Sequence, residues 1–116
     1  MGEAADLKQR ETVDYSLKYH PKKDVKVIKK DGSLEAFNVQ KVINAVGKSA
    51  YRALTKFTDE EKQRICQIVV DKVDELGDEQ IPIPVMHNIV ESALEATRPL
   101  VAKSYRDYRN YKQDFV

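Results

Sequence analysis

The sequence predicts an α+β domain in which a small sheet, a β-hairpin extended to three short strands, packs at one end of a four-helix bundle. Two short runs that alternate apolar and charged residues stand at 25–37, with Asp31–Gly32 between them. Four later segments carry apolar residues at helical spacing. A length of 116 residues is enough for one core but not for a separate catalytic domain.

The hairpin is the first element. Val25–Lys30 alternates apolar and basic residues, and Leu34–Phe37 returns as a second strand. Asp31–Gly32 supplies the backbone freedom that a tight turn requires. Asn38 follows at a position where its side chain can cap a helix.

The expected turn sets which side chains share a face of the hairpin. A two-residue turn at Asp31–Gly32 places Lys29 and Asn38 on one face, but Lys30 and Glu35 on the other. Either the register differs from this one, or a ligand that contacts all four residues wraps the edge of the hairpin.

Two helices are expected next. Apolar spacing predicts the first over Val39–Leu54. Thr58 and Glu61 form a capping box at the start of the second, which is expected to stop at Gly77 through a left-handed cap.

A short strand and two further helices complete the chain. Ile81–Ile83 is interrupted by proline, so we expect at most an edge strand there. Pro84 suits the first turn of a third helix, which runs to about Thr97. Pro99 then starts a fourth helix.

The domain boundary is placed near residue 24. Residues 1–24 are polar and balanced in charge, and are interpreted as an extension or linker, whereas residues 25–116 form the domain. Tyr15, Leu17 and Tyr19 are the side chains of the extension that can dock on the domain.

Composition excludes several functions. The formal net charge is +1, so no global field favours nucleic acid or membrane. Cys66 is the only cysteine, which excludes an intrachain disulfide and a zinc site of paired thiolates, and favours a cytoplasmic protein. Two histidines and one cysteine provide neither a nucleophile with its base nor a cluster of metal ligands, so no catalysis is expected.

Positive charge is concentrated in the hairpin. Lys29, Lys30 and Lys41 stand close to Glu35 and Asn38, a mixture of cations and acceptors that suits a phosphate-bearing ligand. The alternative is a solvated edge whose lysines protect the hairpin against aggregation.

Three separated blocks carry a family resemblance. They read V-x-K-K-D-G-x-x-E-x-F-N-x-x-K-V at 27–42, I-P-V-M-H-N-I-V-E-S-A-L at 83–94 and V-A-K-S-Y-R-D-Y-R-N-Y-K at 101–112. In this order they resemble the ATP-cone domain of ribonucleotide reductases. The resemblance implies a regulatory site for ATP and dATP, and no catalysis by the cone itself. It also implies that the domain is the N-terminal allosteric domain of a longer reductase.

The resemblance also implies roles for single residues. Lys29, Lys30, Lys41 and Lys112 match phosphate ligands, although the family commonly has arginine where Lys30 stands, which replaces a bidentate contact by a point charge. Magnesium is expected to accompany the phosphates.

The base and sugar are expected to meet a second group of residues. By the resemblance, Glu35 and Asn38 read the adenine, and His87 lies near the sugar. A cross-strand ion pair for Glu35 and a helix cap for Asn38 are the alternatives. Packing around base and sugar is expected from residues for which a core role is equally compatible, namely Val27, Val42, Met86 and Tyr108.

The expected partners are adenine nucleotides and the catalytic domain and subunits of a parent reductase, without nucleic acid or membrane. One alternative is a nucleotide-responsive transcriptional regulator, because a similar cone follows a zinc ribbon in a repressor of reductase genes; the cysteines of such a ribbon are missing from this chain. The other is a degenerate cone that acts only as a protein-interaction module.

Overall fold

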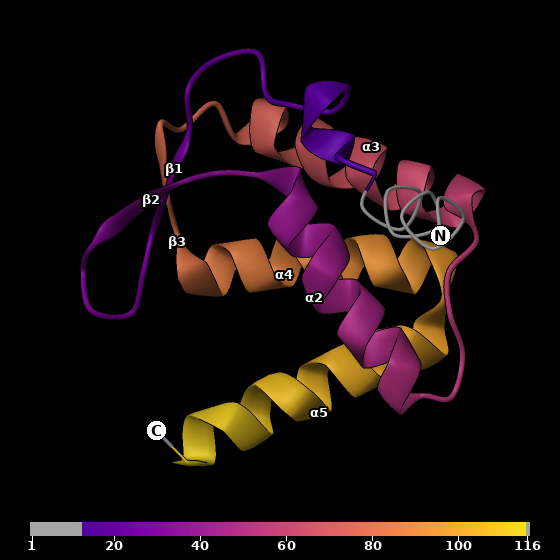
Figure 1. The fold of residues 1–116 in the computed structure, drawn as a ribbon. Helices are drawn as coiled ribbons and strands as arrows, with labels where there is room; N and C mark the ends of the chain where they lie inside the picture. The colour runs from indigo at the N-terminus through magenta and orange to yellow at the C-terminus, as the bar shows by residue number, and fades with distance from the viewer. Residues whose placement is uncertain (1–12, 116) are drawn as a thin grey trace, which may run out of the picture.

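The computed structural model describes residues 13–115, and the side chains within residues 13–107. Figure 1 shows a three-stranded sheet beside four helices, preceded by one short 3-10 helix. The elements, in chain order, are η1 (Tyr15–Leu17), β1 (Lys26–Ile28), β2 (Leu34–Ala36), α2 (Val39–Arg52), α3 (Asp59–Leu76), β3 (Gln80–Pro82), α4 (Ile83–Thr97) and α5 (Pro99–Phe115).

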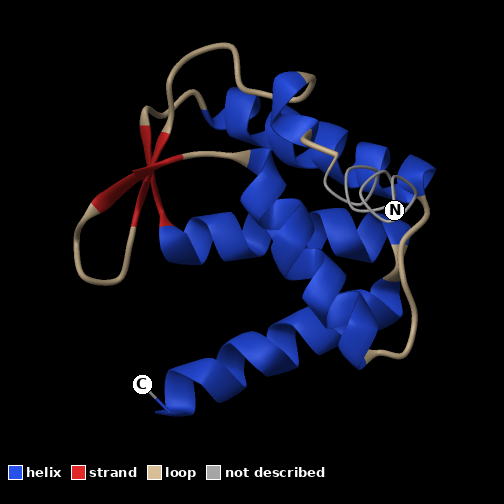
Figure 2. Cartoon of the chain, viewed as in Figure 1, coloured by secondary structure: helices blue, strands red, loops and turns tan. Residues whose placement is uncertain are grey.

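The sheet lies at one side of the helical layer, which confirms the predicted α+β fold (Figure 2). Helix α4 packs between α3 and α5, and α2 packs against both α3 and α5. Strand β3 runs directly into α4, so the sheet is joined to the bundle at the start of that helix. Within the described residues, no helix is both long and apolar enough to cross a membrane.

The strand order is β2-β1-β3. β1 pairs antiparallel with β2 and parallel with β3, so the hairpin strand β1 is central. The predicted edge strand is confirmed, and its position at the edge explains why Pro82 is tolerated: a proline cannot donate a backbone hydrogen bond to a neighbour on both sides.

The hairpin register corrects the expected two-residue turn. Val27 pairs with Glu35, and Ile28 pairs with Leu34. The backbone N–H of Lys29 also donates to the carbonyl of Ser33 at 2.8 Å, which leaves a loop of three residues at 30–32. The backbone N–H of Gly32 donates to the carbonyl of Lys29 at 2.9 Å, and Gly32 has φ +87. This is the turn followed by a left-handed residue that three-residue hairpin loops commonly adopt.

The polar residues of the loop hold this conformation. One carboxylate oxygen of Asp31 accepts from the Ser33 hydroxyl at 2.6 Å and from the Ser33 backbone N–H at 3.0 Å. These bonds, the hydroxyl bond first, lower the pKa of Asp31 from its usual value of 3.8. The aspartate thus supplies an Asx-type turn that the two-residue prediction did not include.

The shift of one residue reverses the faces on which the charged side chains lie. Side chains alternate along a strand, and directly paired residues share a face. Val27 and Lys29 therefore lie on the same face as Glu35, and Lys30 is left at the tip of the loop. The first of the two options raised by the sequence holds: the register differs.

The helix ends follow the sequence closely. Asn38 caps α2, because its Oδ1 accepts from the N–H of Gln40 at 2.8 Å. Thr58 and Glu61 form the predicted capping box of α3. Gly77 ends α3 with φ +70, the predicted left-handed cap. Helix α2 is shorter than expected, because Leu54 adopts φ +59 and leaves the helix.

One core joins the sheet to all four helices. Ile81 from β3 and Ile65, Leu94 and Val101 from the helices are completely or almost completely buried. Tyr15 also belongs to this core, and its backbone N–H donates to Oε1 of Gln40 at 2.8 Å. The described end of the presumed linker is therefore docked.

An arginine clamps the end of the bundle far from the sheet. Arg98, between α4 and α5, contacts both carboxylate oxygens of Glu61, through Nε at 2.7 Å and a terminal nitrogen at 3.0 Å. Its other terminal nitrogen donates to the Thr55 hydroxyl at 2.8 Å, and the guanidinium lies 5.8 Å from the Phe57 ring centre. We refer to Arg98, Glu61, Thr55 and Phe57 as the arginine clamp.

Candidate functional site

A pocket of about 190 Å³ opens between the sheet and three helices. It is walled by β1, β2, the start of α2, the start of α4 and one side chain of α5. Its lining is mainly apolar, with few polar groups, which is the usual character of a small-molecule site. The lining residues are Val27, Glu35, Ala36, Phe37, Asn38, Lys41, Val42, Ala45, Ile83, Met86, His87, Val90 and Tyr105.

An ion-pair network forms the charged wall of this pocket. Nζ of Lys29 lies 3.6 Å from one carboxylate oxygen of Glu35, and Nζ of Lys41 contacts the other oxygen. The Glu35 side chain is 31% exposed, whereas those of Lys29 and Lys41 are 52% and 66% exposed. One half-buried carboxylate thus holds two exposed ammonium groups at the rim.

The helix cap beside this wall limits what Asn38 can do. Its side-chain oxygen is engaged by the N–H of Gln40. Its NH2 group carries the donors that remain for a ligand at the pocket. The capping role that was one of two options for Asn38 is therefore present, and the NH2 group offers its donors to a ligand.

The opposite wall is aromatic and apolar. The rings of His87 and Tyr105 meet edge to face, with centres 6.2 Å apart and planes at 77°. Met86 and Tyr105 are 4% and 8% exposed, so both also serve the core. Packing from two helices fixes the rim position of His87, since α4 presents it and α5 supports it.

The structure brings together most, but not all, of the predicted site residues. Seven line the pocket: Val27, Glu35, Asn38, Lys41, Val42, Met86 and His87. Lys29 joins them through Glu35. Lys30, at the exposed loop tip, does not line it. Tyr108 and Lys112 lie in α5, but their side chains are outside the described residues.

Some lining residues were not among the predicted site residues. Phe37 and Ile83 were expected in strands, and Val90 and Tyr105 fall in the segments with apolar residues at helical spacing. Their periodicity gave the correct face but no indication that this face borders a cavity. Two small residues, Ala36 and Ala45, also line the pocket, and their size leaves room for a ligand.

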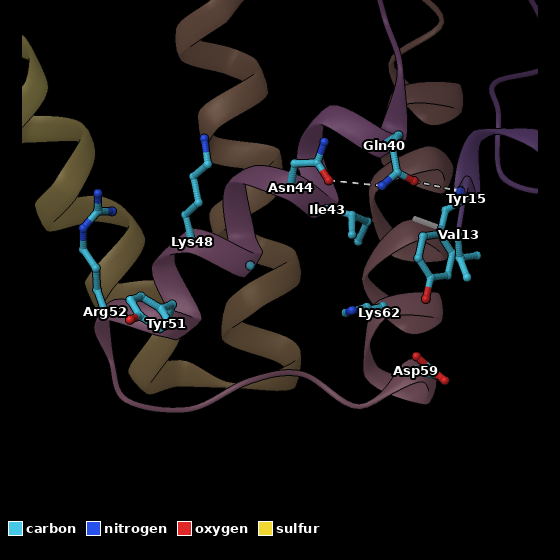
Figure 3. A pocket seen from close by; sticks show the side chains of 11 residues that line it. Val13, Tyr15, Gln40, Ile43, Asn44, Lys48, Tyr51, Arg52, Asp59 and Lys62 are labelled. Atoms are coloured by element: carbon cyan, nitrogen blue, oxygen red, sulfur yellow. Dashed lines mark hydrogen bonds between the residues drawn. The ribbon is translucent and has the colours of Figure 1, made fainter. Parts of the chain in front are cut away.

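A larger hollow of about 880 Å³ lies between η1, α2 and α3. Its cations are Lys48 and Arg52 on α2 and Lys62 on α3. Figure 3 shows Lys62 well apart from Lys48 and Arg52, so the three charges do not converge on one point. Despite its smaller volume, the pocket at the sheet is the better candidate, because there the charges, an apolar lining and a helix start meet.

Within the part of the chain that the structure describes, the other reactive groups do not provide a second site. Burial raises the pKa of the Cys66 thiol to about 12, so the nucleophilic thiolate is scarce at neutral pH. Among the described residues, no group of three or more histidine, cysteine, aspartate or glutamate side chains is placed to hold a metal ion.

Comparison with known proteins identifies the family. The family model described as the ATP cone domain matches residues 25–114. The chain belongs to the ATP-cone family. The cone is therefore a nucleotide-binding regulatory module rather than a catalytic one, and members of this family bind ATP or dATP as effectors.

A curated relative agrees with this assignment. The cone is 37% identical over 86 residues to an anaerobic ribonucleoside-triphosphate reductase from Haemophilus influenzae. The match covers 72% of this chain but 12% of the reductase. The cone thus spans a small part of the length of that relative.

Proposed function

We propose that the cone binds ATP and dATP in the pocket at the sheet and controls the overall activity of a ribonucleotide reductase. The observation that carries this proposal is the junction of the Lys29–Glu35–Lys41 network with an apolar pocket in a chain of the ATP-cone family. The similarity to a ribonucleoside-triphosphate reductase supports the choice of a reductase as the regulated enzyme.

The base and sugar occupy the apolar part of the site in this proposal. A pocket of about 190 Å³ is smaller than the 300 to 1,000 Å³ typical of sites that enclose a whole ligand, so the phosphates extend beyond it. They then meet the ammonium groups of Lys29 and Lys41 at the rim. Glu35 accepts from the exocyclic amine of adenine, and the NH2 group of Asn38 donates to a ring nitrogen.

The regulatory step rests on differential binding. ATP and dATP differ at the ribose 2'-position, and His87 is the polar side chain on the wall opposite the charged rim. A ligand shifts an equilibrium only by its difference in affinity for the two states. A coupling free energy of about 1 to 3 kcal/mol between the pocket and the surface that contacts the reductase is sufficient.

Titration calorimetry with ATP, dATP and GTP tests nucleotide binding by the isolated cone. We expect saturable heats with both adenine nucleotides and a higher melting temperature, because a ligand at 100 times its Kd stabilises the fold by about 2.7 kcal/mol. Absence of heat and of a thermal shift at millimolar ATP and dATP would refute the proposal and favour a cone that serves only protein interaction.

Control of a reductase requires a second test. Activity of a reductase that carries this cone is measured at increasing dATP and ATP, with and without the Lys41→Ala substitution. We expect the two nucleotides to change turnover in opposite directions, and the substitution to weaken both responses. Magnesium is proposed to arrive with the phosphates. A cytoplasmic location stays a prediction.

A further inference from the structure

We propose that Glu35 couples phosphate binding to base identity by acting as an internal anion that holds Lys29 and Lys41 when no nucleotide is bound. The inference rests on the proposed function, because it concerns the same pocket. It assigns to Glu35 a task beyond contact with a base: it excludes ligands that bring phosphates without a suitable base.

The geometry places one carboxylate between two would-be phosphate ligands. Each oxygen of Glu35 faces a different lysine, one on the β1 side and one on α2. The corrected register is what makes this possible, since it puts Lys29 and Glu35 on one face of the hairpin. An arriving phosphate must therefore draw both ammonium groups away from a neighbour that already satisfies them.

The competition is modest and sensitive to salt. Exposed ion pairs contribute about 0.2 to 1 kcal/mol each, so the two pairs together weaken phosphate binding by roughly twofold to thirtyfold. The lysines are the more exposed partners, and can turn toward a ligand without disturbing the core. Salt screens both the pairs and the attraction to phosphate.

When the two lysines turn toward the phosphates, the half-buried carboxylate of Glu35 loses its partners and lies near a highly charged polyphosphate. It then needs another hydrogen-bond donor. The exocyclic amine of adenine provides one. Guanine presents a carbonyl oxygen at the corresponding ring position. Two hydrogen-bond acceptors, this oxygen and the Glu35 carboxylate, would then face each other without a donor between them. A bare polyphosphate provides nothing. Adenine nucleotides therefore recover the interaction that phosphate binding disrupts, whereas GTP and inorganic polyphosphate do not.

Binding of inorganic tripolyphosphate, ATP and GTP to the wild-type cone and to Glu35→Gln tests this coupling. Glutamine keeps the size of the side chain but no longer holds the lysines by charge, and its amide accommodates either base. We expect Glu35→Gln to bind tripolyphosphate about twofold to thirtyfold more tightly at low salt. The ratio of ATP affinity to GTP affinity is expected to fall, and the gain for tripolyphosphate is expected to diminish in 0.5 M salt.

Glu75→Gln is the matched control, because it removes the same charge from an exposed position near the end of α3. It is expected to change tripolyphosphate affinity by less than about twofold. Melting curves show whether each variant is folded, and Glu35→Ala provides a second variant with the same expected gain.

An unchanged or lower tripolyphosphate affinity of both Glu35 variants would overturn the inference, and so would a gain equal to that of the control. These outcomes are distinct from failure of the proposed function. The proposed function fails if the wild-type cone does not bind ATP. The Glu35 effect is measured instead as a change in tripolyphosphate affinity, which depends on the lysines and not on a base.

Discussion

The hairpin rim and the arginine clamp each join a glutamate to basic side chains, but they do so in different ways. In the clamp, Arg98 contacts both oxygens of Glu61, and their side chains are 32% and 25% exposed. At the rim, Glu35 holds two separate lysines that are at least half exposed. A guanidinium fork fixes its partner in one geometry, whereas ammonium groups on flexible stems are easily redirected.

The difference separates stability from binding within one small fold. The clamp connects the α2–α3 loop to the corner between α4 and α5, and is expected to hold the bundle together. Two of the three rim residues, Lys29 and Glu35, lie on a short hairpin, which has few core residues and is expected to open at a lower free energy than the bundle. Substitutions at the rim should therefore change mainly the nucleotide affinity, whereas substitutions in the clamp should change mainly the free energy of unfolding.

The largest effect is expected from replacing both rim lysines. Lys29→Ala/Lys41→Ala should weaken ATP binding by about 30- to 100-fold, equivalent to about 2 to 3 kcal/mol, because charge-assisted bonds to phosphate are lost. The free energy of unfolding should fall by no more than about 0.4 to 2 kcal/mol, the contribution of the two exposed ion pairs to Glu35. Titration calorimetry and urea denaturation measure the two quantities.

The matched control for this double variant is Lys48→Ala/Lys56→Ala, which removes two exposed positive charges outside the pocket. It should leave ATP affinity within about threefold of the wild-type value, through long-range charge alone. An equal loss in both double variants would show that the rim is not the phosphate site.

Arg98→Ala should produce the converse result. We expect about 2 kcal/mol of destabilisation, because Glu61 and Thr55 lose charged hydrogen bonds in a partly buried corner. Arg106→Ala is the control: its contacts with Glu91 and Glu95 are 3.8 and 3.9 Å long, so we expect a loss of less than about 1 kcal/mol. Reduced ATP affinity of folded Arg98→Ala would contradict the separation of the two regions.

The contribution of the arginine clamp to the free energy of unfolding should also depend on pH. Arg98, followed by the backbone bond from Thr58, lowers the pKa of Glu61 below its usual value of 4.5. A carboxylate whose pKa is lower in the folded state stabilises the fold above its unfolded pKa, and this contribution is lost as the pH falls through the folded pKa. The difference in unfolding free energy between wild type and Glu61→Gln should therefore be largest at neutral pH and shrink below pH 4.5.

Urea denaturation at a series of pH values measures this difference. Glu60→Gln, at the preceding residue of the same helical turn, controls for the loss of charge near the start of α3. A difference for Glu61→Gln that does not change between neutral and acidic pH would show that Arg98 does not favour the ionised glutamate.

The smallest effect is expected from Gly32→Ala in the hairpin loop. A methyl group at this position meets no atom within 4 Å, so the cost comes from φ +87 alone and should be about 1 kcal/mol. Because the loop belongs to the hairpin, hydrogen exchange should accelerate in β1 and β2 more than in α3. Uniform acceleration throughout the chain would show that the hairpin and the bundle open together.

Much of the fold follows from local patterns in the sequence. The capping box at Thr58, the left-handed cap at Gly77 and the Asn38 cap were all predicted, because each depends on residues within one turn of the helix end. The apolar stripes also identified the buried faces of the helices. The end of α2 was placed two residues too late, since the positive φ of Leu54 has no local signal.

The hairpin register shows where local reasoning fails. Asp31–Gly32 favours a two-residue turn by composition, but the bonds from Ser33 to Asp31 fit a three-residue loop. A change of one residue moves Glu35 to the face of Lys29, and the candidate site depends on that change. Val27 is partly buried where it packs against the core, and the packing of one sheet face against a core is what specifies register.

The sequence alone determined which residue types this chain contributes to a site: lysines for phosphate, Glu35 and Asn38 for a base, and His87 on a helix. It also determined the helices and their caps, because these are set by neighbours along the chain. Only the tertiary structure decided that Lys29 and Lys41 share one carboxylate, that Phe37 and Tyr105 close the pocket, and that Arg98 reaches Glu61. These contacts join residues far apart in the sequence, and only the packing of the sheet against the helices sets the distances between them.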